Sequence, residues 1–203
     1  MEITVAMVKE LRQATGAGVL DCSKALESSA GDFERAATYL REKGLAAAAR
    51  RMGRQASDGL VEAYVHPGNR IAVLLELNCE TDFVARTDDF KALAHDLALH
   101  IAFAAPRYFI REDVPDEVIE RERAVYHVRA VEEGKPERIV DRIVEGRLEK
   151  FYQQVCLMEQ PFVKDEDRTV QDLITDAIAK FGENVVLRRF VRYESGRGVG
   201  VTR

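Results

Sequence analysis

The sequence predicts an α+β fold, in which a small helical domain precedes a larger domain with an antiparallel sheet packed against helices. Three observations support this prediction. Apolar residues recur at helical spacing over the first 50 residues, three β-rich runs occur later, and helices and strands are grouped along the chain rather than alternating. With 203 residues, of which 46% are hydrophobic, the chain is long enough for one domain and a small companion.

The first 50 residues are predicted to form three short helices. One face of each is apolar: Val5, Val8, Leu11 and Ala14 in the first helix, Cys22, Ala25 and Leu26 in the second, and Phe33, Ala36, Ala37 and Leu40 in the third. Thr15-Gly-Ala-Gly18 ends the first helix, and Asp32 is placed to cap the third. We therefore assign residues 1–53 to a three-helix domain with its linker helix.

Three strands are predicted after this domain. Residues 60–66 and 70–78 are joined by Pro67-Gly68-Asn69, which is typical of a β-hairpin. In the second of these strands alternate residues form an apolar face, made of Ile71, Val73, Leu75 and Leu77. A third strand is expected over residues 184–193. The predicted sheet is therefore three-stranded and antiparallel.

Four helices complete the larger domain. They are expected over residues 88–105, 116–132, 136–155 and 170–182, with a turn at residues 160–162. Thr87 provides a hydroxyl cap for the first of them, and Thr169 with Asp172 has the spacing of a capping box for the last. We assign residues 54–196 to this core domain and the glycine-rich residues 197–203 to a flexible tail.

Composition argues against several classes of protein. The net charge is −5, and residues 55–105 hold three basic and eight acidic residues, whereas phosphate binding needs clustered positive charge. We therefore expect no direct binding of nucleic acid. No apolar run is long enough to span a membrane, and the N-terminus lacks a signal-peptide pattern. Cys22, Cys79 and Cys156 are too few and too scattered for a disulfide framework, which favours a reducing, cytoplasmic location.

Catalytic and metal-binding patterns are weak in this sequence. Gly16-Ala-Gly18 lacks the preceding strand and the following Lys-Ser/Thr of a phosphate loop. His95 and His100 lie on one helix about 140° apart around its axis, so they do not form a metal-binding pair. Cys79 is interpreted as a buried structural thiol rather than as a nucleophile beside a histidine base. We expect no metal, no cofactor and no covalent catalysis.

The segment Cys79-Glu-Thr-Asp-Phe-Val-Ala-Arg86 is the strongest candidate for a binding site. It connects the end of a predicted strand to the cap of the next helix, a place where binding residues often lie. Within it, the carboxylate of Asp82 is next to the large apolar ring of Phe83. Two interpretations remain open at this point: the ring contacts a partner, or it fills the hydrophobic core.

Two long motifs together resemble the family of bacterial translation elongation factor Ts, the guanine-nucleotide exchange factor for elongation factor Tu. They are Val8-Lys-Glu-Leu-Arg-x-x-Thr-Gly-Ala-Gly-x-x-Asp-Cys-x-Lys-Ala-Leu26 near the N-terminus and Leu77-Asn-Cys-Glu-Thr-Asp-Phe-Val-Ala85 at the candidate site. Shorter matching segments follow in the family's order, and the resemblance extends over about residues 3–194.

The resemblance implies a three-helix, ubiquitin-associated-like N-terminal domain and an α+β core with a three-stranded antiparallel sheet. It also implies that the factor docks on elongation factor Tu, inserts a loop near that partner's Mg²⁺ site and speeds the release of GDP. In this chain the implied loop residues are Thr81, Asp82, Phe83 and Val84. The implied contacts of the N-terminal domain are Leu11, Arg12, Thr15, Gly16 and Lys24. Ser23 stands where many members have a second basic residue, so only Lys24 carries that contact.

The length of the chain resembles the short form of the family. Longer members contain two core halves, a helical-hairpin insertion and a C-terminal helix, whereas this chain has 203 residues and one core. A short form that replaces the second half by pairing with a copy of itself would be a homodimer, and we expect one here. Because the three cysteines are expected to stay reduced, that dimer is predicted to be non-covalent.

Overall fold

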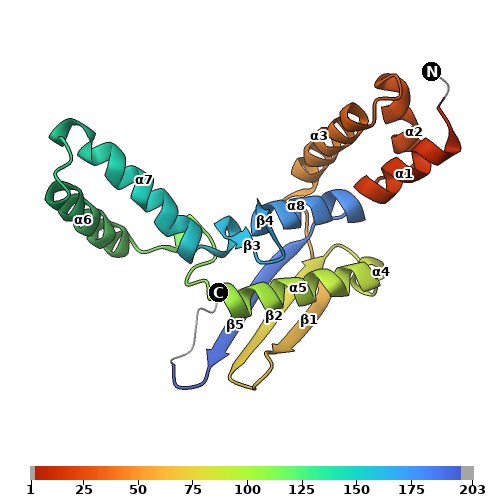
Figure 1. Cartoon of the computed structure of the whole chain (residues 1–203). Coiled ribbons are helices and arrows are strands. Elements are labelled where there is room, and N and C mark those ends of the chain that lie inside the picture. Colours follow the sequence, from red (N-terminus) through yellow and green to blue (C-terminus); the bar gives the residue numbers. More distant parts are fainter. Residues whose placement is uncertain (1–2, 198–203) are drawn as a thin grey trace. The chain divides into compact units, whose positions relative to one another are not determined.

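The computed structural model describes residues 3–197, so the predicted tail from Gly198 onwards lies outside the described part. By its contacts the chain divides into two compact units. The first comprises residues 1–59, 78–84 and 174–186, and the second comprises residues 60–77, 85–173 and 187–203. Helices occur in both units and most of a three-stranded sheet lies in the second, which confirms the predicted α+β class (Figure 1).

Three helices at the N-terminus of the first unit pack around a small apolar core (Figure 1). They are α1 (Val5–Thr15), α2 (Val19–Ser28) and α3 (Phe33–Arg51). The core side chains are Leu11, Cys22, Ala25, Leu26, Ala36 and Leu40. Asp32 Oδ1 accepts a hydrogen bond from the Arg35 amide at 3.0 Å, as expected of the cap of α3. The three predicted helices are therefore confirmed.

The buried face of α1 differs from the predicted stripe. Val5 is 86% exposed and Ala14 is exposed as well, whereas Met7 and Val8 pack with Leu11 against the core. The reason is geometric. Each step of three residues falls about 60° short of a full helical turn, so a strict i, i+3 run drifts off the buried face within a few steps.

Helix α3 is longer than a three-helix domain requires, because it continues through Gly44 to Arg51. In the first unit it lies close to the second half of α8 (Val170–Phe181). A Cβ placed on Gly44 would stand 3.3 Å from Cβ of Ala179, which is tighter than an ordinary contact. This close approach accounts for a glycine inside a helix, a position that otherwise lowers helix stability.

The sheet contains β1 (Asp58–Val65), β2 (Ile71–Cys79) and β5 (Val186–Glu194) in the order β1-β2-β5. Between β1 and β2 the Asn69 amide donates to His66 O at 3.0 Å, which closes a turn with Pro67 and Gly68 at its centre. Gly68 has a φ of 94°, a value that favours glycine at the third position of such a turn. Ser195 N donates to Arg70 O at 2.8 Å, so the end of β5 lies beside the start of β2 and the two strands are antiparallel. The three predicted strands are confirmed, with their ends shifted by one or two residues.

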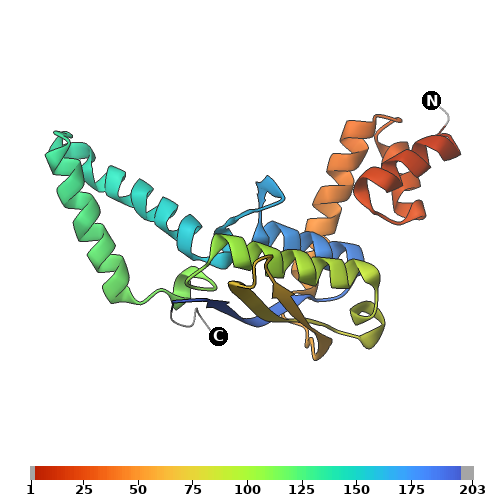
Figure 2. The same ribbon diagram turned by 60° about the horizontal axis from the view of Figure 1, so that its bottom comes forward.

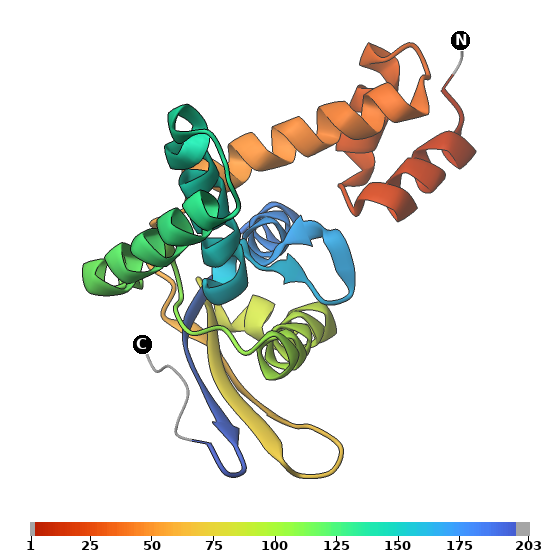
Figure 3. The same ribbon diagram turned by 60° about the vertical axis from the view of Figure 1, so that its left-hand side comes forward.

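One face of the sheet is covered by α5 (Asp88–Ala104) (Figure 3). Thr87 caps this helix by accepting from the Phe90 amide at 3.3 Å, as predicted. Glu62, on the covered face of β1, contacts His95 of α5 at 2.9 Å. The outward face has exposed apolar side chains on all three strands: Val61, Val65, Leu74 and Tyr193.

A long antiparallel helical hairpin forms part of the second unit (Figure 2). Its arms are α6 (Asp116–Glu132) and α7 (Glu137–Val155), which agree with the predicted helices. Their shared core contains Ala130, Val140, Val144 and Leu148. A helical-hairpin insertion was expected only in the longer members of the family, so the presence of this hairpin differs from what the length of the chain suggested.

Arg111, in a short 3₁₀ turn (Arg111–Asp113), holds the base of the hairpin. Its guanidinium donates to Glu149 of α7 at 2.8 and 2.5 Å and to Glu159, and it stacks over the Tyr152 ring at 4.6 Å from the centroid. These carboxylates raise the pKa of Arg111 still further above its ordinary range.

A second, two-stranded sheet was not predicted. Its strands are β3 (Pro161–Phe162) and β4 (Asp165–Thr169), where only a turn was expected at 160–162. Buried His100 holds it to α5, because Nδ1 accepts from the Val163 amide at 3.2 Å and Nε2 lies 3.1 Å from Gln160 Oε1. After β4 the predicted capping box is present, with Thr169 N donating to Asp172 Oδ2 at 3.0 Å and Asp172 N to Thr169 Oγ1 at 3.1 Å.

Candidate functional site

The candidate segment begins where β2 ends. The sequence predicts a loop here, but Asp82–Ala85 form a single helical turn, α4, directly after Thr81. The side chains of Cys79 and Ala85 on either side are buried. Thr81, Asp82 and Val84 are half-buried, and Phe83 is exposed. We call residues 81–84 the Thr81–Val84 turn. A helical turn presents successive side chains in different directions, which explains why Phe83 differs from its neighbours.

Phe83 is 80% exposed. The interpretation that this ring fills the hydrophobic core is therefore wrong, because a core ring would be almost completely buried. A large apolar side chain on the surface costs free energy in water unless a partner covers it. The exposed ring, next to the Asp82 carboxylate, is thus the feature of this turn that is best suited to contact another molecule.

The turn is held by Glu183, a residue that follows α8 and lies about a hundred positions after the turn in sequence. Glu183 Oε2 accepts hydrogen bonds from the backbone amides of Glu80 at 3.1 Å and Thr81 at 3.0 Å. Glu183 Oε1 accepts from the Thr81 hydroxyl at 2.6 Å. Hydrogen bonds to an ionised carboxylate are shorter and stronger than neutral ones. One side chain therefore fixes both the backbone and the first side chain of the turn.

Glu80 provides the reciprocal contact. Its Oε1 accepts from the Asn184 amide at 2.7 Å and lies 3.7 Å from Arg54 Nη1. The buried Asn184 side chain in turn donates to Arg54 O at 2.7 Å, and buried Asn78 donates to Ala56 O at 3.3 Å. Three separate segments of the first unit are thus joined at the base of the turn: the residues after α3, the end of β2 and the residues after α8.

The residues predicted in the N-terminal helices have different environments. Arg12, Gly16 and Lys24 are exposed, and Thr15 is half-buried, with its hydroxyl donating to Leu11 O at 2.7 Å. Gly16 has a φ of 68°, which a residue with a side chain adopts at a cost, and it ends α1. Leu11 itself is fully buried in the three-helix core. Its side chain therefore supports the predicted contact surface and is not available to touch a partner.

Sequence reasoning missed several residues that belong to these regions. Val19 and Leu20, at the start of α2, are 53% and 76% exposed beside the predicted contact residues. An apolar pair directly after a glycine turn was a signal that could have pointed to them. Glu183 and Asn184 carried no such local signal, because their partners at Glu80 and Thr81 are about a hundred positions away.

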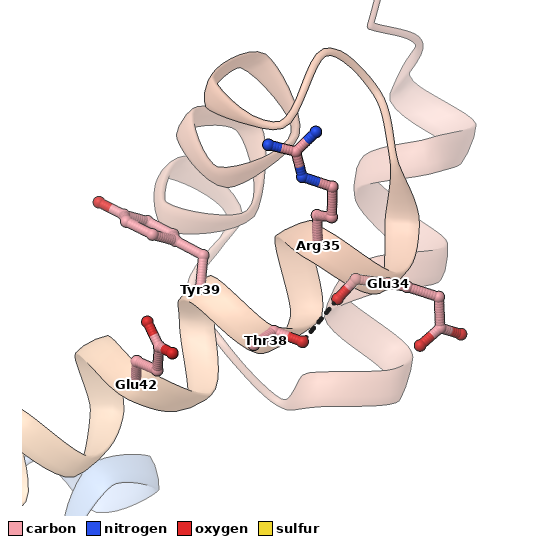
Figure 4. A pocket seen from close by; sticks show the side chains of 5 residues that line it. All are labelled: Glu34, Arg35, Thr38, Tyr39 and Glu42. Atoms are coloured by element: carbon pink, nitrogen blue, oxygen red, sulfur yellow. Dashed lines mark hydrogen bonds between the residues drawn. The ribbon is translucent and has the colours of Figure 1, made fainter.

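A shallow hollow lies on the surface of α3 (Figure 4). Its lining side chains are Glu34, Arg35, Thr38, Tyr39 and Glu42, all from one face of this helix. The Thr38 hydroxyl donates to Glu34 O at 2.9 Å within the helix. Because every lining residue comes from one helix, polar groups do not converge on an enclosed space as they do in ligand pockets.

The three cysteines and His100 have buried side chains. All three cysteines are buried thiols outside any disulfide bond, and burial raises the pKa of Cys156 to about 12. Burial also lowers the pKa of His100. Among residues 3–197 no group of three or more His, Cys, Asp or Glu side chains is placed to hold a metal ion. Nor does any helix in this described range have the length and apolar character needed to cross a membrane.

Comparison with known proteins identifies the family. The family model described as Elongation factor TS matches residues 27–177. Elongation factor Ts of Moorella thermoacetica is 59% identical over 197 residues, which cover 97% of this chain and 97% of that protein. The proteins of the same name from Carboxydothermus hydrogenoformans and Heliobacterium modesticaldum are 60% and 59% identical, with 97% of this chain and 91% and 92% of each relative covered. The chain belongs to the elongation factor Ts family of translation factors.

Proposed function

We propose that this chain binds the GDP complex of elongation factor Tu and promotes release of GDP by inserting the Thr81–Val84 turn near the Mg²⁺ site of that partner. The observation that carries the proposal is the 80% exposure of Phe83 on a turn whose backbone is fixed by Glu183. An exposed ring on a fixed base can enter a partner without first paying for its own ordering.

The proposed action requires no covalent step and no cofactor. A GTPase holds GDP tightly because Mg²⁺ and the phosphate-binding loop neutralise the diphosphate. A side chain that displaces groups around Mg²⁺ lowers the affinity for GDP by about tenfold for each 1.4 kcal/mol of lost interaction. Linkage then requires that bound GDP lowers the affinity of the partner for this factor by the same ratio. The role of the factor is therefore to change binding equilibria and rates, and it acts in the cytoplasm, where translation takes place.

The N-terminal helices, residues 1–53, serve in this proposal as a docking domain. Arg12, Thr15, Gly16 and Lys24 form or support the contact surface, and exposed Leu20 adds an apolar side chain to it. Leu11 contributes indirectly, by packing the core that holds α1 against α2 and α3. Docking through this surface brings the Thr81–Val84 turn to the nucleotide-binding domain of the partner.

A second copy of the chain is proposed to cover the outward face of the sheet. Val61, Val65, Leu74 and Tyr193 are each 45–67% exposed there, on neighbouring strands. Two charged side chains on this face, Glu76 and Arg189, pair with one another at 2.7 Å. A face that is apolar and internally charge-paired is suited to contact the same face of a copy across a two-fold axis. Sedimentation should find a dimer for the wild type and a monomer for Leu74→Glu, and a wild-type monomer at micromolar concentration would contradict this arrangement.

Release of a fluorescent GDP analogue from elongation factor Tu tests the main proposal. We expect the purified chain to accelerate release in a saturable manner that depends little on added RNA. An unchanged release rate at every concentration would contradict the proposed function. If the chain instead bound RNA directly, its affinity would fall steeply as salt is raised, in proportion to the number of phosphate contacts.

A further inference from the structure

We propose that Glu183 is a positioning residue for exchange: its carboxylate fixes the Thr81–Val84 turn so that Phe83 is presented in one direction. This inference rests on the proposed function, because it assigns the ring a task in the partner. It concerns a residue outside both long sequence motifs. In this inference the exchange activity of the turn depends on Glu183, a side chain that does not itself touch the partner.

The first support is the geometry at Glu183. Its two carboxylate oxygens accept from the amides of Glu80 and Thr81 and from the Thr81 hydroxyl, at 2.6–3.1 Å. Consecutive backbone amides that converge on one carboxylate leave little freedom for rotation about the peptide between them. Because α4 begins directly after Thr81, the orientation of this peptide sets the direction of the helical turn that carries Phe83.

The second support is the reciprocal contact. Glu80 Oε1 accepts from the Asn184 amide at 2.7 Å, so each of the two connections supplies a carboxylate to the backbone of the other. A shift of the turn relative to the end of α8 would therefore break hydrogen bonds in both directions at once. Partly buried polar networks of this kind stabilise one geometry specifically, since each unmade bond leaves a desolvated group.

The third support is the link to the end of α3. Asn184 Nδ2 donates to Arg54 O at 2.7 Å and Asn78 Nδ2 donates to Ala56 O at 3.3 Å. The segment that follows the N-terminal helices is thus tied to the same residues that hold the turn. We call the hydrogen bonds of Glu183 and Glu80 the clamp. Since docking is assigned to those helices, the clamp connects the docked surface and the Phe83 ring to the same residues of the first unit.

The exposure of Phe83 separates positioning from ordinary stabilisation. The ring is 80% exposed, so the clamp does not serve to bury it. Loosening the turn leaves the apolar cores in place and increases the range of directions that the ring samples. Loosening the turn should therefore lower the rate of GDP release, the step in which the ring acts, more than the affinity with which the N-terminal helices dock.

The test uses the full chain and elongation factor Tu loaded with a fluorescent GDP analogue. Glu183→Gln keeps the size of the side chain but replaces one acceptor oxygen by an NH₂ group that faces the donors of Glu80 and Thr81. It is compared with Phe83→Ala, with the double variant, and with Glu166→Gln, which makes the same change at an exposed position of β4. For each variant, release rates are measured over a range of factor concentrations, together with the melting temperature and the hydrogen exchange of the Glu80 and Thr81 amides.

We expect Glu183→Gln to lower the maximal release rate about tenfold while the half-saturating concentration changes less than about twofold. The Glu80 and Thr81 amides should exchange faster, and Glu166→Gln should behave as wild type. Because Glu183 acts through Phe83, adding Glu183→Gln to Phe83→Ala should cause little further loss.

Three outcomes would overturn the inference while the proposed function stands: a normal maximal rate in Glu183→Gln beside a slow Phe83→Ala, an equal loss in both backgrounds, or a loss that follows the melting temperature. A normal rate in Phe83→Ala is different. It would remove the proposed role of the turn itself, whatever Glu183→Gln does.

Discussion

The Thr81–Val84 turn and the three N-terminal helices belong to the same unit, and both are proposed to meet the partner, but they are built in different ways. The helices hold their surface with a core of six buried residues. The turn holds its exposed ring with hydrogen bonds from Glu183 and Glu80. Apolar packing is not directional, whereas hydrogen bonds are. The helices are therefore suited to supply binding area, and the turn is suited to aim one side chain.

Replacing Leu11 by Ala should produce the largest effect on stability in either region. Leu11 is fully buried in the small core of the three helices, and removing its isobutyl group leaves a cavity. We expect a loss of about 2–5 kcal/mol in the stability of the N-terminal helices, with weaker docking as a result. Thermal melting followed by circular dichroism measures it.

Val5→Ala is the matched control, because Val5 lies on the same helix and is 86% exposed. It should change stability by less than about 0.5 kcal/mol. Equal effects of the two substitutions would show that the stability of the three helices does not depend on the burial of Leu11.

Phe83→Ala should show the opposite pattern. Because the ring is exposed, stability should change little, whereas burial of such a side chain against the partner is worth about 1.5–3 kcal/mol. The loss should appear mainly in the rate of GDP release, with Asp82→Ala weaker in the same direction. Release assays and melting curves on the same preparations measure both quantities.

The chain offers a close control in Phe103, which is 78% exposed on α5 and outside the turn. With the Phe103→Ala variant, elongation factor Tu should release GDP at the wild-type rate. A large drop in melting temperature for Phe83→Ala, with unchanged exchange per folded molecule, would contradict the assigned role of the ring.

The contrast between the two regions also explains what the sequence could and could not predict. Caps such as Asp32, Thr87 and Thr169 were found because a capping side chain and its partner lie within three residues. The alternation in β2 predicted its buried face for the same local reason. The N-terminal core residues Cys22, Ala25 and Leu26 were likewise predicted from helical spacing.

The clamp at the turn could not be found in that way. Glu183 bonds to residues 80 and 81 across more than a hundred positions, and one carboxylate among 35 acidic residues carries no signal of its partner. The β3–β4 pair was missed because Asp165–Thr169 has the composition of a loop. It is ordered by long-range contacts, such as that between Val163 and His100. Exposure of Phe83 likewise depends on how α4 is oriented, which periodicity does not report.

Acidification is expected to lower the stability of the second unit through a buried histidine that lies outside both regions. The four histidines, at positions 66, 95, 100 and 127, all lie in the second unit. Burial lowers the pKa of His100 below its ordinary value of 6.5, and its Nδ1 accepts from the Val163 amide, so the folded state favours the neutral ring. Protons then bind more strongly to the unfolded chain, and stability should fall as the pH drops below about 6.5 towards the lowered pKa.

Melting temperatures at pH 7.5 and 5.5 measure this effect, and His100→Gln should reduce the difference between them. His127→Gln, on the exposed surface of α6, is the control and should leave the difference unchanged. If His100→Gln melts with the same pH dependence as the wild type, the buried imidazole is not its source.

The smallest expected effect belongs to Lys24, and it tests whether the N-terminal surface grips partly by charge. Lys24 is exposed, so an ion pair with the partner is worth about 0.2–1 kcal/mol and is screened over about 8 Å at physiological ionic strength. Lys24→Ala should raise the half-saturating concentration by less than about fivefold at low salt, with the maximal release rate unchanged. Ser23→Lys, which restores a second basic residue, should act in the opposite direction. Both differences should vanish at high salt, whereas the loss in Phe83→Ala should persist because it is not electrostatic. A maximal rate that fell with Lys24→Ala would mean that the helices and the turn do not divide docking and exchange between them.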